Sequence, residues 1–423
     1  MRLESYYSTG HVDLLQVAKG RPRSQEESVP KRQRFPHGGE GMGAWHYLEG
    51  LCRLGPRGSA TEGERQAAQW IAARLEELGY DVEIQPFMSP RHTLYLGPAA
   101  VMAGMLVARN LAAWSAPLAV AVMILLLVPL VGEMLGARVN FDLILPKRPS
   151  QNVVARETGG RPGVPVVVSA HYDTQRGSWL FAPWFRPWLR PFFVSVYAAL
   201  AVVPLGTLLA WAFPGAGWMN GAARIAAVWL AAALVFLFLS WATGRYVEGA
   251  NDNGSGVAVA LALAERWKAE PIPGLAPIFV FTGCEESGLR GMRRFLATAD
   301  LPPGTAFLNL DNVGGGRLHY LLGEGMLVYR RYDADLVATA RAVAQEFGDE
   351  IRPLPNLLLP TDALVAAAAG YPAVTLLAAG ENGAIPNYHW HSDVLANADR
   401  RVVELAETYA WRLLVAIGRR AGA

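Results

Sequence analysis

Histidines and acidic residues follow the apolar runs of this sequence at the points where strands would end. His171 and Asp173 come directly after "VPVVVSA", Asp311 ends "TAFLNLD", and Glu285 and Glu286 follow "APIFVFTGC". Proteins bind zinc through imidazole, carboxylate and thiolate groups, so the first two kinds of ligand are present here. An Asp two residues after a His can also receive its ring N–H and fix its tautomer. These residues therefore predict a metal site.

Asp252, His389 and His391 occupy loops next to predicted helices or strands. Asp252 lies in "GANDNGSG", which opens a helix, and the histidines lie in "NYHWHSD", after the last predicted strand. Each has an ordinary structural alternative, such as capping a helix or lying on the surface, and acids in a first helical turn are favoured by the helix dipole. Together, however, the groups suit two zinc ions about 3.5 to 4 Å apart, bridged by one carboxylate. The five candidate ligands are His171, Asp252, Glu286, Asp311 and His389.

Segments with the pattern of strands alternate along the chain with segments that have the period of helices. This alternation predicts an α/β fold with a mostly parallel mixed sheet and helices on both faces. Sheets of this kind collect their chemistry at the carboxyl ends of the strands, where the candidate ligands lie. The predicted strands are "DVEIQPF", "SQNVVAR", "VPVVVSA", "APIFVFT", "AFLNLD" and "PAVTLLA".

Four long apolar segments account for a composition that is 52% hydrophobic and only 17% charged. They cover about residues 93–108, 110–132, 192–213 and 225–244. A helix needs roughly 20 apolar residues to cross a bilayer, and the first segment, the shortest, would extend Arg109 to the interface. Buried helices of a large soluble core are the alternative interpretation. We expect two transmembrane helical hairpins inserted into the α/β domain.

Basic residues next to these segments predict their orientation. Arg91, Lys147 and Arg186 lie on the side shared with the rest of the chain, whereas the two tight turns carry only Arg109 and Arg224. The positive-inside rule then places the catalytic domain in the cytoplasm, as part of an integral membrane protein with four spans. The predicted parts are a disordered or overlong N-terminus at 1–40, a catalytic domain made of 41–91, 138–190 and 246–423, and hairpins at 92–137 and 191–245.

Charge and cysteine content argue against two other classes of protein. The formal net charge is +2 and no basic stripe interleaved with aromatic residues is present, which argues against a nucleic-acid partner. Cys52 and Cys284 are the only cysteines, so a disulfide framework is not expected. The lipid bilayer is an expected partner because of the four apolar segments, and the oligomeric state is left open.

Several of these segments together resemble a known family. "HYDT", "GANDNGSGVA", "TGCEESGLRGM", "NLDNVG" and "NYHWHSD", with the helix "TEGERQAAQWIAARL", are similar to the co-catalytic di-zinc exopeptidases that include bacterial leucyl aminopeptidases and glutamate carboxypeptidases. The resemblance covers about residues 44–90 and 149–415, without the second hairpin. It implies a phosphorylase/hydrolase-like α/β fold, with the two hairpins as insertions that the family usually lacks.

The resemblance also implies roles for the candidate residues. Asp252 would bridge two Zn²⁺ ions, Glu285 would be the general base, and Asp173 would support His171. By analogy Tyr388 would donate to an oxyanion, with packing as its alternative role. The spacing within "HWHSD" favours His389 over His391 as the ligand. The implied sets are His171 and Asp311 for one ion, and Glu286 and His389 for the other.

These roles predict a membrane-anchored zinc-dependent exopeptidase, most simply an aminopeptidase. Zinc lowers the pKa of a bound water to about 7, and Glu285 would take its proton as the water attacks a peptide carbonyl. Two other functions stay open. Glutaminyl cyclases share this fold and catalyse acyl transfer with one zinc, and some relatives are inert membrane receptors or scaffolds.

Overall fold

A computed structural model describes residues 42–135, 139–160, 163–213, 215, 217–325, 328–357, 360–381 and 383–421. The segment 1–40, predicted to be disordered or overlong, lies outside the described residues. The other predicted boundaries fall within or beside them, and every structural statement below concerns the described residues.

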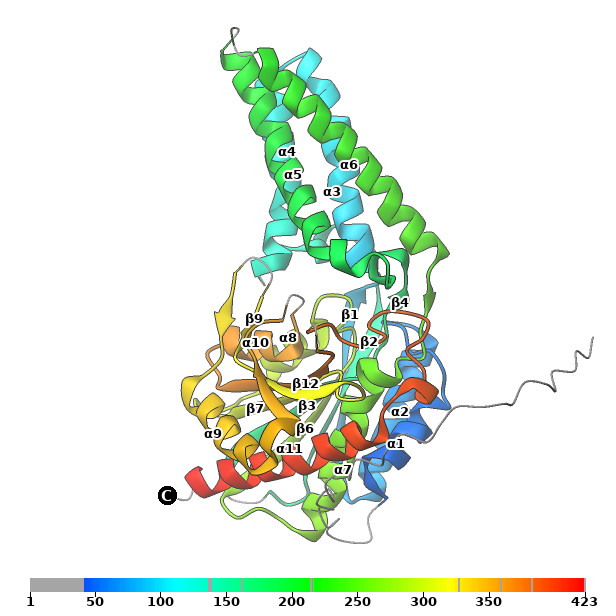
Figure 1. Cartoon of the computed structure of the whole chain (residues 1–423), viewed down its shortest axis with the longest axis vertical. Coiled ribbons are helices and arrows are strands. Elements are labelled where there is room, and N and C mark those ends of the chain that lie inside the picture. Colours follow the sequence, from blue (N-terminus) through cyan, green and yellow to red (C-terminus); the bar gives the residue numbers. More distant parts are fainter. Residues whose placement is uncertain are drawn as a thin grey trace, which may run out of the picture. The chain divides into compact units, whose positions relative to one another are not determined.

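An eight-stranded mixed sheet forms the centre of the α/β part, in the order β1-β2-β6-β3-β7-β12-β8-β11 (Figure 1). The inner strands β6, β3, β7 and β12 are parallel to one another, whereas β1, β2 and β8 run antiparallel to their inner neighbours. The predicted mostly parallel central sheet is confirmed, but the short strands β8 and β11 were not predicted. The bounds are β1 Tyr80–Pro90, β2 Lys147–Glu157, β3 Val164–His171, β6 Leu275–Thr282, β7 Ala306–Leu310, β8 Arg317–Leu321, β11 Ile351–Leu354 and β12 Ala373–Ala379.

Helices cover both faces of this sheet, as predicted (Figure 1). A strand enclosed in this way is apolar on both sides, and Val166, Val167 and Val168 of β3 are accordingly all fully buried. The first long helix begins where the sequence predicts, since the Thr61 side chain accepts a hydrogen bond from the Glu64 N–H. The helices are α1 Gly43–Cys52, α2 Glu62–Glu77, α7 Gly256–Ala269, α8 Arg290–Thr298, α9 Ala334–Ala344, α10 Asp362–Ala368 and α11 Arg400–Ala421.

Four further helices are long and apolar enough to cross a membrane. They pack beside one another (Figure 1) around a second apolar core that includes Met102, Met123, Val203 and Leu230. Their outer surfaces expose large apolar side chains, as on Ile225, which is 75% exposed; such surfaces are expected in lipid rather than in water. The helices are α3 Thr93–Asn110, α4 Ala116–Leu135, α5 Leu189–Ala212 and α6 Gly217–Thr243.

Both helical pairs leave and re-enter the α/β part at points where two strands lie side by side. The pair α3 and α4 connects β1 to β2, whose ends meet in antiparallel register at Pro90 and Lys147. The pair α5 and α6 is closed by β4 (Arg176–Gly177), which pairs with β5 (Arg245–Tyr246). Because each insertion returns to its starting point, the order of the central sheet is unaffected.

The buried Arg290 at the start of α8 joins the first insertion to the α/β part. Its Nη2 lies 2.6 Å from Oε2 of Glu133 in α4, and its Nε lies 3.1 Å from Oδ1 of Asp142, just beyond that helix. Glu133 also approaches the backbone closely at Gly288, where φ is +100°; a Cβ there would lie only 2.3 Å from Glu133 Oε1. The end of α4 is therefore held against the turn that follows β6.

Arg290→Met should destabilise the fold, because it leaves Glu133 without its cation and leaves Asp142 with only the more distant Lys147, at 3.8 Å. Loss of one partner from a fully buried ion pair lowers the free energy of unfolding by about 3 to 5 kcal/mol. Because both acids are partly exposed, we expect a smaller loss here, roughly 2 to 3 kcal/mol. Thermal unfolding in detergent measures the effect. The control is Arg156→Met, whose pair with Glu83 is exposed and should change stability by less than about 1 kcal/mol. Equal effects of the two substitutions would contradict the assignment.

Candidate metal centre

The parallel strands bring the predicted residues to one edge of the sheet. β3 ends at His171, β6 ends three residues before Glu285, β7 ends immediately before Asp311, and the loop after β12 leads to His389. Because neighbouring parallel strands have their carboxyl ends at the same edge, these side chains converge. Asp252 reaches this edge from the turn Ala250–Ser255, directly before α7.

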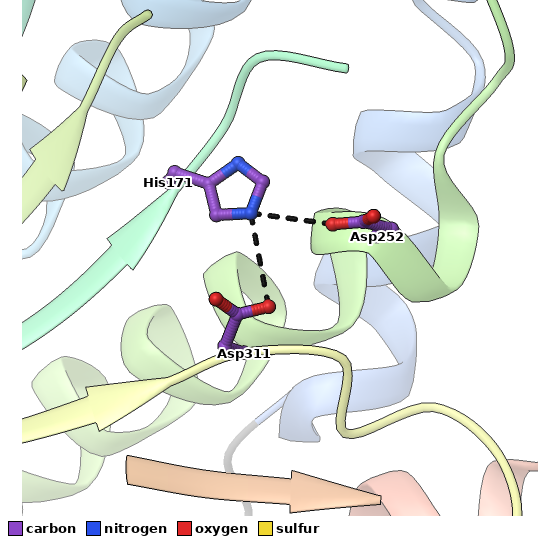
Figure 2. Close-up of side chains that lie close together, drawn as sticks. All are labelled: His171, Asp252 and Asp311. Atoms are coloured by element: carbon purple, nitrogen blue, oxygen red, sulfur yellow. Dashed lines mark ion pairs between the residues drawn. The ribbon is translucent and has the colours of Figure 1, made fainter. Parts of the chain in front are cut away.

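His171, Asp252 and Asp311 form the first cluster (Figure 2). Nε2 of His171 lies 3.3 Å from Oδ1 of Asp252 and 3.8 Å from Oδ1 of Asp311. Figure 2 shows the imidazole pointing toward both carboxylates, which come from two other segments of the chain. All three residues are buried, and one ligand atom from each lies within 4.8 Å of the others.

Asp252, Glu286 and His389 form a second cluster of the same kind. Nε2 of His389 lies 3.0 Å from Oδ2 of Asp252 and 3.0 Å from Oε1 of Glu286. Asp252 thus presents one carboxylate oxygen to each cluster. His389 is buried whereas His391 is exposed, so the structure brings the preferred histidine, and not its neighbour, to Asp252.

The two clusters fit a pair of divalent cations. His389 Nε2 lies 3.0 Å from both Asp252 Oδ2 and Glu286 Oε1, yet none of these three buried atoms is aligned for a hydrogen bond with a described residue. Buried polar atoms are normally hydrogen-bonded, so these three are arranged for another kind of partner. Several carboxylates also share a small buried volume, which is unfavourable unless cations compensate their charge. The donor set, imidazoles and carboxylates, suits zinc.

Asp173 supports the site differently from the expectation. The carboxylate was expected to accept the ring N–H of His171, but Nδ1 lies 3.6 Å from Oδ1 and only 3.1 Å from the Asp173 backbone carbonyl. The carboxylate instead accepts the backbone N–H groups of Glu285 and Glu286, at 3.0 and 3.3 Å, and the Ser59 hydroxyl at 2.6 Å. Asp173 therefore ties the turn after β6 to the end of β3.

Asp393 fixes the Asp252 turn and was not among the predicted site residues. Its two carboxylate oxygens accept the backbone N–H groups of Asn251 and Asp252, at 2.7 and 3.0 Å. Burial raises the pKa of Asp393 to about 7, with the negative charge of Asp252 adding to the effect. In the sequence, only its position four residues after His389 could have indicated that Asp393 belongs to the site.

Two further residues that sequence reasoning missed tie the site's loops together. The fully buried Arg57 donates from Nε to the Tyr172 carbonyl at 2.8 Å and from Nη2 to the Gly249 carbonyl at 2.8 Å, which joins the end of β3 to the turn that holds Asp252. Glu64 accepts the Cys284 N–H at 3.0 Å, next to Glu285. In the sequence, Glu64 resembles an ordinary acid in the first turn of a helix.

Glu285 and Asp252 differ in their electrostatic surroundings. Burial, with the charges of Glu286, Asp311 and Asp362, raises the pKa of Glu285 well above its usual range, although His171 opposes the shift. Burial acts in the same direction on Asp252, but the two neighbouring histidines outweigh it and hold the pKa of Asp252 below its usual range. Glu285 Oε2 lies 4.0 Å from His171 Nε2, and Glu285 belongs to neither cluster.

Tyr388 lies beside the clusters with its ring stacked on that of His389. The ring centroids are 3.8 Å apart, and Phe181 contacts Tyr388 edge-on at 5.6 Å. Tyr388 also lines the polar hollow that contains the clusters, together with Glu285 and Glu286. Both roles considered for it, packing and donation to a substrate oxygen, fit this placement.

Known structures with the same architecture define the class of the fold. A glutaminyl cyclase from Tannerella forsythia is 16% identical and has a TM-score of 0.54, with 88% of this chain and 97% of that chain covered. A Zn-dependent exopeptidase from Parabacteroides distasonis is 14% identical, with a TM-score of 0.53 and coverage of 89% and 96%. A zinc aminopeptidase from Bacillus subtilis is 16% identical, with a TM-score of 0.51 and coverage of 89% and 94%. The chain has the fold that these proteins share.

The sequence itself supports a narrower grouping. Residues 238–414 match the model of peptidase family M28. The matched stretch contains Asp252, Glu285, Glu286 and His389, as well as Asp311, and begins after His171. Comparison with curated protein sequences gives no match. The match supports the resemblance to zinc exopeptidases noted from the motifs.

Asp252→Asn should weaken binding at both clusters, because Asp252 is the residue they share. We expect a fall in affinity larger than the roughly 10- to 100-fold that follows loss of an outer partner of a metal ligand. Asp311→Asn should affect one cluster alone, and the control Asp335→Asn, on the surface of α9, should affect neither. Elemental analysis of zinc per chain after dialysis measures the outcome. A zinc content in Asp252→Asn equal to that of the unmodified protein would contradict the bridging position.

Proposed function

We propose that this protein is a membrane-anchored zinc exopeptidase, acting as an aminopeptidase, with two zinc ions held by the two clusters. The observation that carries the proposal is the position of Asp252, which faces His171 with one carboxylate oxygen and His389 with the other. The match to peptidase family M28 and the fold shared with zinc exopeptidases support it.

Zinc supplies Lewis-acid chemistry at such a site, because it polarises a carbonyl group and lowers the pKa of water to about 7. The residues of the chain provide the rest. His171, Asp252 and Asp311 would hold one ion, and Asp252, Glu286 and His389 the other. The backbone clamps from Asp173 and Asp393 keep these ligands in place without occupying their ligand atoms.

Glu285 is placed to take a proton from the attacking water. Its backbone is fixed by Asp173 and its side chain lies outside both clusters, so its carboxylate is free to accept a proton from water. The same carboxyl group then returns the proton to the departing amine. Glu286, the next residue, faces the second cluster, so neighbouring acids have separate tasks.

Acyl transfer of the glutaminyl cyclase kind is the second candidate function, because several of the similar structures are glutaminyl cyclases. Two complete clusters favour hydrolysis with two ions over chemistry with a single ion. Release of ammonia from a peptide with an N-terminal glutamine, with the pyroglutamyl residue left on the peptide and one zinc per chain, would favour the cyclase instead. An inert receptor or scaffold would hydrolyse no reporter with any metal added.

Glu285→Gln should keep the bound zinc and lose most of its turnover. Removal of a general base lowers rates by about 100- to 10,000-fold, and the amide cannot accept the proton. The measurements are kcat on an aminoacyl amide reporter and zinc per chain on the same preparation, with Glu76→Gln, on the exposed surface of α2, as control. Turnover near that of the unmodified enzyme would show that another residue is the base.

We also propose that α3 to α6 cross the bilayer with the α/β part in the cytoplasm. Cysteine labelling tests this, since the native Cys52 and Cys284 are both buried. An impermeant maleimide should label Ala113→Cys and Gly215→Cys, in the two turns between the helices, in intact cells. It should label Thr158→Cys, in the loop after β2, only after permeabilisation. The reverse pattern would invert the orientation, and labelling of all three positions without permeabilisation would argue against spans.

A further inference from the structure

An apolar cavity of about 180 Å³ lies between the inserted helices and the turn that carries Glu285 and Glu286. Its apolar wall comes from the first turns of α3, the last turns of α4, one residue of α5 and the segment after α4. A cavity of about 150 Å³ lined by apolar side chains is large enough to bind benzene, so this one has room for an aromatic ring or a short alkyl chain. The apolar residues that these segments contribute are Leu94, Pro98, Leu130, Met134, Phe141 and Tyr197.

This cavity adjoins the polar hollow at the metal centre. The hollow measures only about 10 Å³, which is room for a single water-sized group. Both spaces are lined by Glu285, Glu286, Tyr388 and His389, along with Pro360. A molecule whose reacting carbonyl lies at the clusters therefore has its nearest apolar space against the inserted helices.

Two charged groups at the cavity, Glu133 and Glu286, already have partners, and Glu285 and His389 lie where the cavity meets the metal centre. Glu133 is paired with Arg290, and Glu286 accepts a hydrogen bond from Gln175 Nε2 at 3.0 Å besides facing the second cluster. The remaining surface favours an apolar occupant, because burying an unpaired polar group against it would be costly.

We propose that the cavity binds the apolar side group of the substrate residue whose carbonyl is attacked. This proposal rests on the proposed exopeptidase function. The inserted helices α3 and α4 then form part of the substrate site as well as the membrane anchor. The substrates are peptides that begin with an aromatic or alkyl residue, and the position of the cavity at the ends of candidate spans suits amphiphilic peptides held at the membrane surface.

Filling the cavity tests the proposal. The substrates are coumarin amides of alanine, phenylalanine and 2-aminodecanoic acid, and the variants are Met134→Trp and Leu94→Trp, which place a bulky ring in the cavity from two helices. The control is Leu125→Trp, on the exposed surface of α4. One methylene in an apolar pocket changes kcat/KM by about 10- to 200-fold, so the phenylalanine-to-alanine ratio should fall by about tenfold or more in both variants and stay constant in the control.

The arms of this experiment separate the possible results. If the 2-aminodecanoyl amide exceeds the phenylalanyl amide in kcat/KM, the cavity accepts a lipid-like chain; the opposite order shows a preference for ordinary side chains. An unchanged ratio in both tryptophan variants, with the unmodified enzyme active, would overturn the cavity proposal and leave the exopeptidase proposal standing. Absence of turnover of every reporter would count against the exopeptidase proposal alone, and the cavity would then be judged by labelling.

Photolabelling tests whether the cavity binds an apolar side group even when the protein shows no turnover. A diazirine derivative of phenylalanine amide, irradiated with the Glu285→Gln protein, should label peptides containing residues 93–98 and 130–134. An excess of phenylalanine amide should suppress the labelling, and Met134→Trp should reduce it, while Leu125→Trp should not. Labelling confined to other segments, or unaffected by competition, would overturn the proposal.

Discussion

The burial of several carboxylates around Asp252 is the constraint on which this structure depends. Like charges in a low-dielectric interior repel one another strongly, so such a cluster persists only if cations or protons compensate it. The site has two imidazoles, His171 and His389, and each contacts one oxygen of Asp252. The arrangement thus leaves two places for added positive charge, on either side of a single carboxylate.

The candidate ligands are held in place by other residues, which form hydrogen bonds with backbone groups. Asp173 accepts N–H groups from the turn after β6, Asp393 accepts them from the Asp252 turn, and Arg57 donates to carbonyls at the end of β3 and in that same turn. Each clamp joins two loops that follow different elements. Displacing one loop would therefore disturb its neighbours, which is how a site built on loops can stay preorganised.

The fold and the five candidate ligands could be predicted because they depend on local pattern. His171 and Asp311 end apolar runs that only buried strands explain, and parallel strands end at one edge. Arg57 and Glu64 could not be predicted, since their partners are backbone groups far away in the sequence, and nothing local marks which carbonyl or N–H they reach. Asp173 was found, but its partners were misjudged: sequence spacing placed it near His171 and could not show the N–H groups arriving from β6.

The inserted helices do more than interrupt the catalytic domain. Glu133 at the end of α4 lies against Gly288, only three residues from Glu285, and is held there by Arg290. Gly288 has a positive φ, and a Cβ there would lie 2.3 Å from Glu133 Oε1, so a side chain at this position would be strained and would displace Glu133. The turn that carries Glu285 is thus fitted to the end of α4, so movement of this helical pair would act directly on the candidate metal centre. This fit makes the first insertion a structural part of the candidate metal centre.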